Sequence, residues 1–287
     1  MSSDFLQQMA SSSRDRVQAA RRTLADAALL DKALATPEPP PLQRNAAGFD
    51  LIAELKLRSP AAGQLKSGDE DVPARVTAYA RAGAAAVSIL TEPSRFDGSL
   101  AHLQAGARAL ESLRVPAMRK DFLVDPYQVV EARAAGAGGV LVILRMLPRE
   151  QTAVLLDCAR SLGLFVLLEA FDPADIEQMH DLIKAHPRQV LLAGVNCRDL
   201  TTLQVVPDRL EKMAHLLPTT VPRVAESGVG SAEDARRVSA AGYDLALVGS
   251  ALMQGGDPRA LANAMLEAGR AAHRAEPVRD PLPPPRD

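Results

Sequence analysis

Charged side chains stand directly after several of the most apolar runs in this 287-residue sequence. Glu54 and Lys56 follow a run that begins at Leu51, Lys120 closes a second run, and Glu169 closes a third. A charge beside a buried apolar run costs free energy unless it faces solvent or a paired site, so the repeated pattern indicates one shared polar site. Ammonium groups among carboxylates are suited to proton transfer, and burial can bring the pKa of a lysine towards neutrality.

Lysine is rare in this chain, which makes its positions informative. Only six of the 33 basic residues are Lys and the other 27 are Arg. Arg stays protonated, whereas Lys is compact and titratable. We therefore predict that Lys56 and Lys120 act as proton donors or as direct ligands of an anionic substrate.

Small residues follow the last two apolar runs, at Ser227-Gly228 after Glu226 and at Gly249-Ser250. Such loops expose backbone N–H groups that can bind a phosphate, and this is a common phosphate position in barrels. Another run ends in Asn196-Cys197-Arg198. These polar groups are expected to join the same site.

The elements that position these residues repeat eight times along the chain. Short aliphatic runs, typical of buried parallel strands, alternate with helical stretches. The strands are predicted at 51–54, 85–90, 115–120, 139–144, 164–169, 190–196, 222–226 and 244–249. The helices are predicted at 73–81, 99–111, 126–135, 149–162, 174–185, 207–216, 231–241 and 258–272. Eight such units favour a closed α/β barrel of the (β/α)8 (TIM) type, whose functional site lies at the carboxyl ends of the strands.

Three segments make up the predicted organisation of the chain. Residues 1–47 form an N-terminal helical extension with one helix from about Arg14 to Leu34, residues 48–274 form the barrel, and residues 275–287 are a Pro-rich disordered tail. Ala-Gly pairs come shortly before several of the predicted strands, and their glycines are expected to provide the left-handed cap that ends the preceding helix.

Composition excludes several other functional classes. The formal net charge is −2 without a dense basic run, which disfavours nucleic acid. No segment resembles a secretory leader or a membrane span, and the only two cysteines, Cys158 and Cys197, suit a reducing cytoplasm rather than a disulfide framework. We expect a cytoplasmic protein, a monomer or weak homodimer, whose partner is a small phosphorylated substrate.

Seven segments, in order, carry a resemblance to a known family. They read IAELKLRSP at 52–60, RKDF at 119–122, DPYQ at 125–128, EARAAGA at 131–137, VNCRDL at 195–200, VAESGV at 224–229 and VGSALM at 248–253. They resemble indole-3-glycerol-phosphate synthase from about residue 10 to residue 267. The resemblance implies a (β/α)8 barrel with a helical extension, and a carboxy-lyase of tryptophan biosynthesis that uses no metal or organic cofactor.

The resemblance also implies a role for each matching residue. Lys120 takes the place of the general acid, Lys56 that of the group holding the departing carboxylate, and Glu169 that of the base. Glu54 and Asn196 complete the catalytic set, Asn196 with Glu226 fixing the sugar. The other matching positions bind the phosphate or wall the aromatic ring: Ser59, Arg198, Ser227, Gly228, Gly249 and Ser250 for the phosphate end, and Phe96, Phe122 and Leu141 for the ring.

Two positions depart from the family pattern. Ala61 stands where a second Ser is usual, and Phe171 stands where a polar residue is common.

Two alternative functions remain open, a related phosphate-binding barrel such as phosphoribosylanthranilate isomerase and a non-catalytic paralogue that only binds ligand. The isomerase should carry a Cys or Asp acid/base pair where this chain has Glu54 with Lys56, and Glu169. Neither lysine's step in the reaction follows from the sequence.

Overall fold

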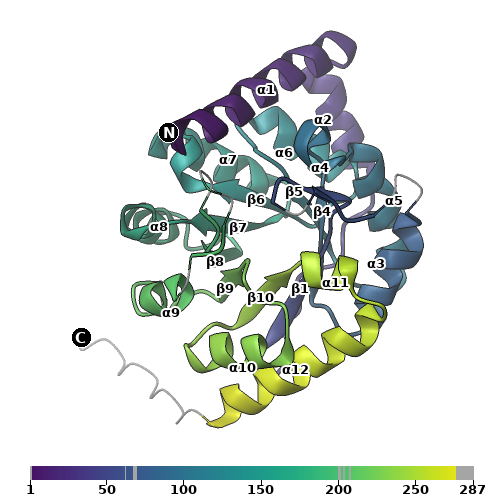
Figure 1. The fold of residues 1–287 in the computed structure, drawn as a ribbon. Helices are drawn as coiled ribbons and strands as arrows, with labels where there is room; N and C mark the ends of the chain where they lie inside the picture. Colours follow the sequence, from purple (N-terminus) through teal and green to yellow (C-terminus); the bar gives the residue numbers. More distant parts are fainter. Residues whose placement is uncertain are drawn as a thin grey trace, which may run out of the picture.

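Eight parallel strands close into a barrel in the computed structural model, which describes residues 2–61, 63–66, 70–199, 202, 204–206 and 208–275 (Figure 1). The strand order around the barrel is β1-β10-β9-β8-β7-β6-β5-β4, and β4 closes the ring by pairing with β1. The barrel strands are β1 (Asp50–Leu55), β4 (Ala86–Leu90), β5 (Ala117–Lys120), β6 (Gly139–Ile143), β7 (Phe165–Ala170), β8 (Leu191–Asn196), β9 (Arg223–Glu226) and β10 (Leu245–Val248). The predicted (β/α)8 architecture is confirmed.

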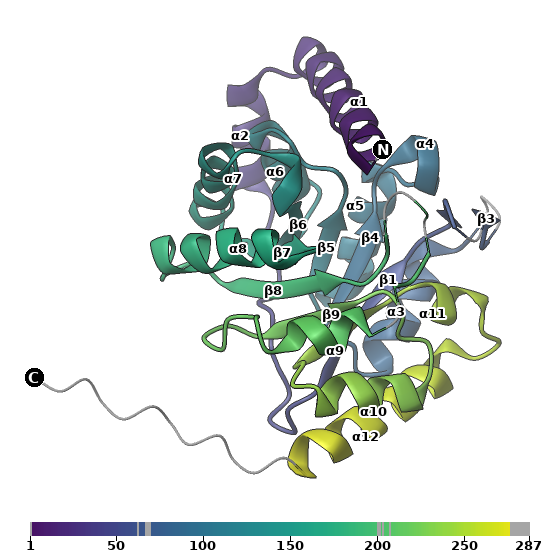
Figure 2. The same cartoon turned by 60° about the vertical axis from the view of Figure 1, so that its left-hand side comes forward.

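A ring of helices surrounds the strands (Figures 1 and 2). The helices that follow successive strands are α3 (Val72–Arg81), α5 (Leu100–Glu111), α6 (Pro126–Ala134), α7 (Arg149–Ser161), α8 (Pro173–Ala185), α9 (Arg209–Ala214), α10 (Ala232–Ala240) and α12 (Pro258–Ala275). Short elements lie in the loops: the hairpin β2 (Arg58–Ser59) and β3 (Gly63–Gln64), α4 (Pro93–Phe96), the 3-10 turn η1 (Leu144–Met146) and α11 (Ser250–Gln254). The sequence patterns did not predict these loop elements, because each is too short to show a periodicity.

Local sequence explains where the surrounding helices begin and end. The side chains of Asp71, Ser99 and Asp172 each accept a hydrogen bond from a backbone N–H in the first turn of the following helix. Gly83 and Gly242 follow helix ends with φ of +93° and +95°, the left-handed conformation that glycine adopts without a Cβ penalty. The predicted Ala-Gly caps are therefore confirmed at these joins.

Apolar side chains pack in two layers. One layer lies between the strands and the ring of helices, and it includes Val87, Val142 and Leu168. The other fills the barrel interior, where Ile52, Met118 and Leu167 come from the opposite faces of their strands. The alternation of side chains along a strand decides which residues reach the interior and so which can reach its mouth.

The N-terminal extension differs from the single helix predicted between Arg14 and Leu34. Helix α1 spans Ser2–Thr23, and α2 spans Asp26–Ala35 after a break at which Ala25 has extended backbone. The prediction overlooked a buried stripe along the first part of α1, whose sequence looks polar. The side chains of this stripe recur at helical spacing: Leu6, Met9, Ala10, Ser13 and Val17. This stripe docks α1 onto the barrel.

In the part of the chain that the structure describes, no helix is both long enough and apolar enough to cross a membrane. The predicted Pro-rich tail from 275 onward lies outside the described residues except for Ala275.

Candidate active site

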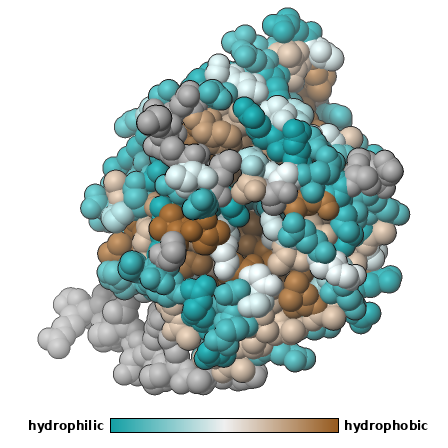
Figure 3. All heavy atoms as spheres, viewed as in Figure 1, coloured by the Kyte–Doolittle hydropathy of each residue, from teal (hydrophilic) through white to brown (hydrophobic). Residues whose placement is uncertain are grey.

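The carboxyl ends of the strands surround a cavity of about 450 Å³. This volume falls in the range of small-molecule sites. The space-filling view in Figure 3 shows the hollow near the middle of this face, with apolar residues at its edges. All but one of the predicted site residues line it: Glu54, Lys56, Ser59, Phe96, Lys120, Phe122, Glu169, Asn196, Arg198, Glu226, Ser227, Gly228, Gly249 and Ser250. Residues that are up to 196 positions apart in the sequence thus meet in one chamber.

Glu54 and Lys56 form a close ion pair at the end of β1. The Nζ of Lys56 lies 2.7 Å from Oε1 of Glu54, and the Glu54 side chain is 3% exposed. Burial raises the pKa of Glu54, but the ammonium groups of Lys56 and Lys120 outweigh that effect, so its pKa is lowered. Gly249 provides the space for this carboxylate, because a Cβ there would lie 2.2 Å from Oε1 of Glu54.

Lys120 at the end of β5 approaches Glu169 at the end of β7, with 3.5 Å between Nζ and Oε2. Asn196 donates a 2.8 Å hydrogen bond from Nδ2 to the other oxygen of Glu169 and so orients that carboxylate. Burial lowers the pKa of Lys120, yet the carboxylates of Glu169, Glu54 and Glu226 outweigh it and its pKa is raised. Burial alone does not bring the pKa of this lysine towards neutrality, because the acids around it stabilise the ammonium more than burial penalises it.

Glu226 is the third carboxyl group of the cavity and is 1% exposed. Within the described part of the chain, neither of its side-chain oxygens has a hydrogen-bond partner. Burial and the carboxylates of Glu169 and Glu54 raise the pKa of Glu226 well above its ordinary value, and the opposing charge of Lys120 does not cancel them. The raised pKa favours the protonated form of this buried acid. Gly194 on β8 makes room for it, since a Cβ there would lie 2.3 Å from its Oε1.

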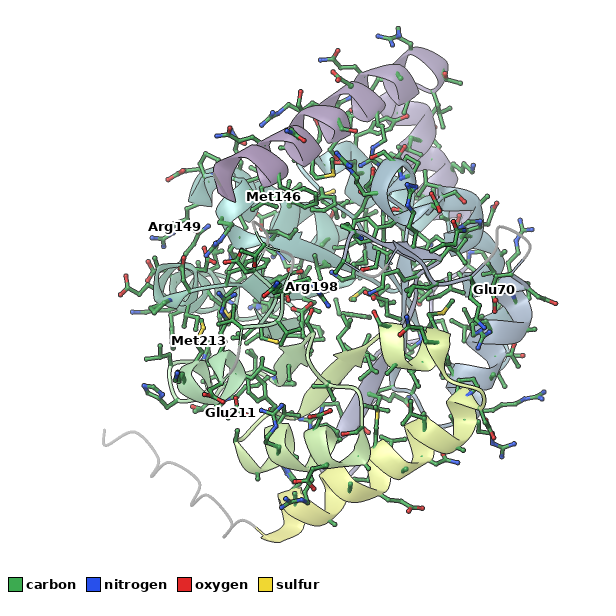
Figure 4. All side chains as sticks on the ribbon, in the orientation of Figure 1. Glu70, Met146, Arg149, Arg198, Glu211 and Met213 are labelled. Carbon is green, nitrogen blue, oxygen red and sulfur yellow. The ribbon has the colours of Figure 1, made fainter. Side chains whose placement is uncertain are left out.

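The glycine and serine residues gather at the ends of β9 and β10. Ser227 and Gly228 both have left-handed backbone, with φ of 65° and 70°, and they turn the chain away from Glu226. A Cβ on Gly228 would lie 2.8 Å from Sγ of Cys197, which explains the absence of a side chain there. Arg198 projects over the middle of the barrel from the loop after β8, as Figure 4 shows. This end of the cavity combines backbone N–H groups, hydroxyls and a guanidinium, the groups that bind phosphate.

Phenylalanine side chains form the opposite wall. The rings of Phe96 and Phe122 lie with centroids 6.2 Å apart, and Phe5 of α1 meets the ring of Phe122 edge-on at 5.9 Å. All three line the cavity. An apolar wall of this kind suits a flat aromatic body. Sequence reasoning missed Phe5, because nothing in the sequence indicates that the first turns of α1 return to the barrel mouth.

Leu141 is the one predicted residue that the structure does not bring to the cavity. It is fully buried inside the barrel, and Ile143 lines the cavity instead. Both residues belong to β6 and to the interior cluster, but Ile143 is two residues closer to the carboxyl end. Since alternate residues of a strand stack in layers along the barrel axis, Leu141 supports the layer below the mouth.

The two departures from the family pattern have separate structural explanations. Ser59 Oγ accepts a 3.3 Å hydrogen bond from the backbone N–H of Ala61, so this loop contact does not need a hydroxyl at 61. Phe171 is buried in the interior cluster that also contains Leu6 and Met9 of α1. The guanidinium of Arg145 lies 4.7 Å from the centre of its ring. Phe171 therefore helps to seat the N-terminal helix.

Both cysteines are free thiols, and burial raises their pKa values. Neither is predisposed to nucleophilic chemistry. Among the described residues, no three His, Cys, Asp or Glu side chains are grouped to hold a metal ion.

Comparison of the fold with solved structures supports the barrel architecture. Thiamine phosphate pyrophosphorylase from Pyrococcus furiosus superimposes with a TM-score of 0.58 at 17% identity, over 79% of this chain and 99% of that one. The 3-hexulose-6-phosphate synthase from Salmonella typhimurium gives 0.59 at 15% identity, over 78% and 100%. At such identities the likeness concerns the fold alone. Fold and cavity together define a (β/α)8-barrel enzyme with acid and base groups at the strand ends.

Sequence comparison identifies the family. The family model for indole-3-glycerol phosphate synthase matches residues 6–265. The indole-3-glycerol phosphate synthase of Mycobacterium tuberculosis (strain CDC 1551 / Oshkosh) is 41% identical, over 86% of this chain and 89% of its own. That of Nocardioides sp. (strain ATCC BAA-499 / JS614) is 43% identical, over 84% and 90%. The chain belongs to the indole-3-glycerol phosphate synthase family.

Proposed function

We propose that this cavity converts 1-(2-carboxyphenylamino)-1-deoxyribulose 5-phosphate into indole-3-glycerol phosphate, CO2 and water. The observation that carries the proposal is the meeting of Lys56, Lys120, Glu54 and Glu169 between an aromatic wall and a glycine-serine rim. The substrate has the same order of parts, an aromatic ring at one end and a phosphate at the other. Its reacting carbons would lie between them, beside the charged groups.

Ring closure is the first chemical step. The ring carbon that bears the carboxylate attacks the ribulose carbonyl carbon, and the carbonyl oxygen takes a proton. We assign that proton to Lys120, whose raised pKa keeps its ammonium form populated at neutral pH. Glu169, 3.5 Å away, offsets the positive charge of the ammonium before the transfer.

Loss of CO2 restores the aromatic ring. The bond between the ring and the carboxylate breaks, and its electron pair returns to the ring. Lys56 is assigned to hold this carboxylate until it leaves, with Glu54 fixing the ammonium through their 2.7 Å contact. A carboxylate that is held by one cation in a buried chamber is also kept in a defined orientation towards the carbonyl.

Dehydration completes the indole. The hydroxyl formed at ring closure takes a proton from an ammonium group, assigned to Lys56, and leaves as water, while the methylene carbon beside the anilino nitrogen gives up a proton to a base and the C=C bond of the indole forms. Glu169 is assigned as that base, and its hydrogen bond from Asn196 holds the carboxylate in place. Glu226, Asn196 and the rim residues Ser59, Arg198, Ser227, Gly228, Gly249 and Ser250 are assigned to the sugar and phosphate.

The direct test is turnover of this substrate by the purified protein, followed through indole fluorescence. The chain contains no Trp, so the product emits against a nearly dark background. We expect saturable formation of indole-3-glycerol phosphate by the wild-type protein without added metal or cofactor. Absence of product at micromolar enzyme would overturn the assignment and favour a ligand-binding role.

Location and assembly follow as further proposals. The free thiols of Cys158 and Cys197 and a role in amino-acid biosynthesis support a cytoplasmic enzyme. One chain supplies all of the residues assigned above, which supports function as a monomer or weak homodimer. Light scattering at assay concentrations tests the oligomeric state.

A further inference from the structure

A buried carboxylate lies directly behind the proton-donating lysine. Asp121 follows Lys120 at the end of β5, and its side chain is fully buried. It accepts hydrogen bonds from Arg119 at 3.1 Å, from Thr91 at 2.6 Å and from the backbone N–H of Phe122 at 2.8 Å. Asp121 lines the cavity next to Lys120, while its buried carboxylate is engaged by Arg119, Thr91 and the backbone N–H of Phe122. Asp121 therefore fixes the turn after Lys120.

The N-terminal helix supplies the remaining contacts of this carboxylate. Arg16 of α1 donates from Nη1 and Nη2 to the two oxygens of Asp121, at 2.9 and 2.8 Å. Burial raises the pKa of Asp121, but the charges of Arg119 and Arg16 outweigh it and hold its pKa far below the ordinary range. A bidentate pair between a guanidinium and a buried carboxylate has strict geometry and is among the stronger charged contacts.

Ser13 forms a second link, one helical turn before Arg16. Its hydroxyl donates to the backbone carbonyl of Phe122 and accepts hydrogen bonds from Arg16 at 3.2 Å and from Gln128 at 2.8 Å. Gln128 also accepts from the backbone N–H of Val124 at 2.8 Å. The backbone from 121 to 124 is thus held by side chains of α1 and α6.

We propose that Arg16 and Ser13 are positioning residues for the reaction, which act through Asp121 and the Phe122 carbonyl on the placement of Lys120 and of the Phe122 ring. The proposal rests on the function proposed above. Helix α1 thus affects catalysis, although the side chains of Arg16 and Ser13 do not line the cavity. The same helix carries Phe5 into the aromatic wall. The placement of α1 therefore fixes both the Phe5 ring, which contacts the Phe122 ring, and the Ser13 hydroxyl, which contacts the Phe122 carbonyl.

The geometry predicts the size of the effect. Lys120 must deliver a proton to one oxygen, and displacement of a reacting group by about 1 Å can reduce the rate on the order of a hundredfold. Loss of Arg16 leaves Asp121 paired with Arg119. The turn therefore loosens, but the Asp121 carboxylate is not left as an unpaired buried charge. We expect Arg16→Met to lower kcat by about ten- to a hundredfold while KM changes less than about threefold.

Matched variants separate this role from general stabilisation. Arg14→Met removes an exposed Arg from the same helix and serves as the control. Arg16→Lys keeps one charged contact with Asp121 and should restore part of kcat, while Ser13→Ala should lower kcat in the same direction by a smaller factor. Arg16→Met should add little to Asp121→Asn, because both act through one contact.

Hydrogen exchange gives a readout that does not depend on turnover. Amides between Arg119 and Val124 should exchange about tenfold faster in Arg16→Met than in Arg14→Met. Unchanged kcat and exchange in Arg16→Met and Ser13→Ala, with or without a lower melting temperature, would overturn the proposal. If the wild-type protein does not turn over the substrate, the proposed function fails, and exchange alone decides whether Arg16 holds this turn.

Discussion

Gly249→Ala should disable the enzyme by displacing Glu54, without removing any functional group. The new Cβ would lie 2.2 Å from Oε1 of Glu54, whereas ordinary contact begins at 3.4 Å. The carboxylate must therefore retreat by about 1.2 Å. We expect a displacement of this size to disrupt the 2.7 Å contact of the carboxylate with Lys56 in this buried site.

A misplacement of about 1 Å costs on the order of a hundredfold in rate, which corresponds to about 2.7 kcal/mol of transition-state free energy. We expect this loss in kcat for Gly249→Ala, measured by indole fluorescence. KM should change little, because the backbone N–H groups at the rim remain. Gly256→Ala is the matched control in the neighbouring loop, since a Cβ there meets no atom of the described residues within 4 Å. Equal kcat for the two variants would refute the steric argument.

Three further predictions concern the titratable groups. Lys120→Met should abolish product formation while leaving the melting temperature within a few degrees of wild type; near-normal turnover would remove Lys120 as the acid. Glu226→Gln should stabilise the free protein relative to wild type, and increasingly so as the pH rises above 4.5. In the wild type, native Glu226 keeps its proton at pH values where the unfolded chain releases it, so the free energy of unfolding falls as the pH rises from 4.5 towards the raised pKa. Melting temperatures from pH 5 to 9 test this, and a pH-independent difference from wild type would contradict it. Iodoacetamide at pH 7.5 should leave activity unchanged over the assay, because burial raises the pKa of Cys158 to about 11 and also raises that of Cys197; rapid inactivation with labelling of Cys197 would show otherwise.

The sequence by itself determined the repeating architecture and most of the site. Apolar runs alternating with helical stretches indicate eight strands, and the carboxyl ends of parallel strands meet at one edge whatever the detailed packing. Residues such as Glu54, Lys120 and Glu169, which end these runs, therefore had to converge. Local signals also placed helix boundaries within a few residues, because capping by Ser99 and Asp172 depends on near neighbours.

Tertiary structure decided what depends on distances between segments. The pKa of Lys120 is raised because three carboxyl groups from other strands surround it, and no local pattern reveals the balance between their charge and burial. Leu141 and Ile143 both face the barrel interior, and only the stagger of the closed barrel shows which reaches the mouth. Phe5 joins the cavity wall and Arg16 reaches Asp121 because α1 folds back over the end of β5, and no local pattern shows where a helix docks.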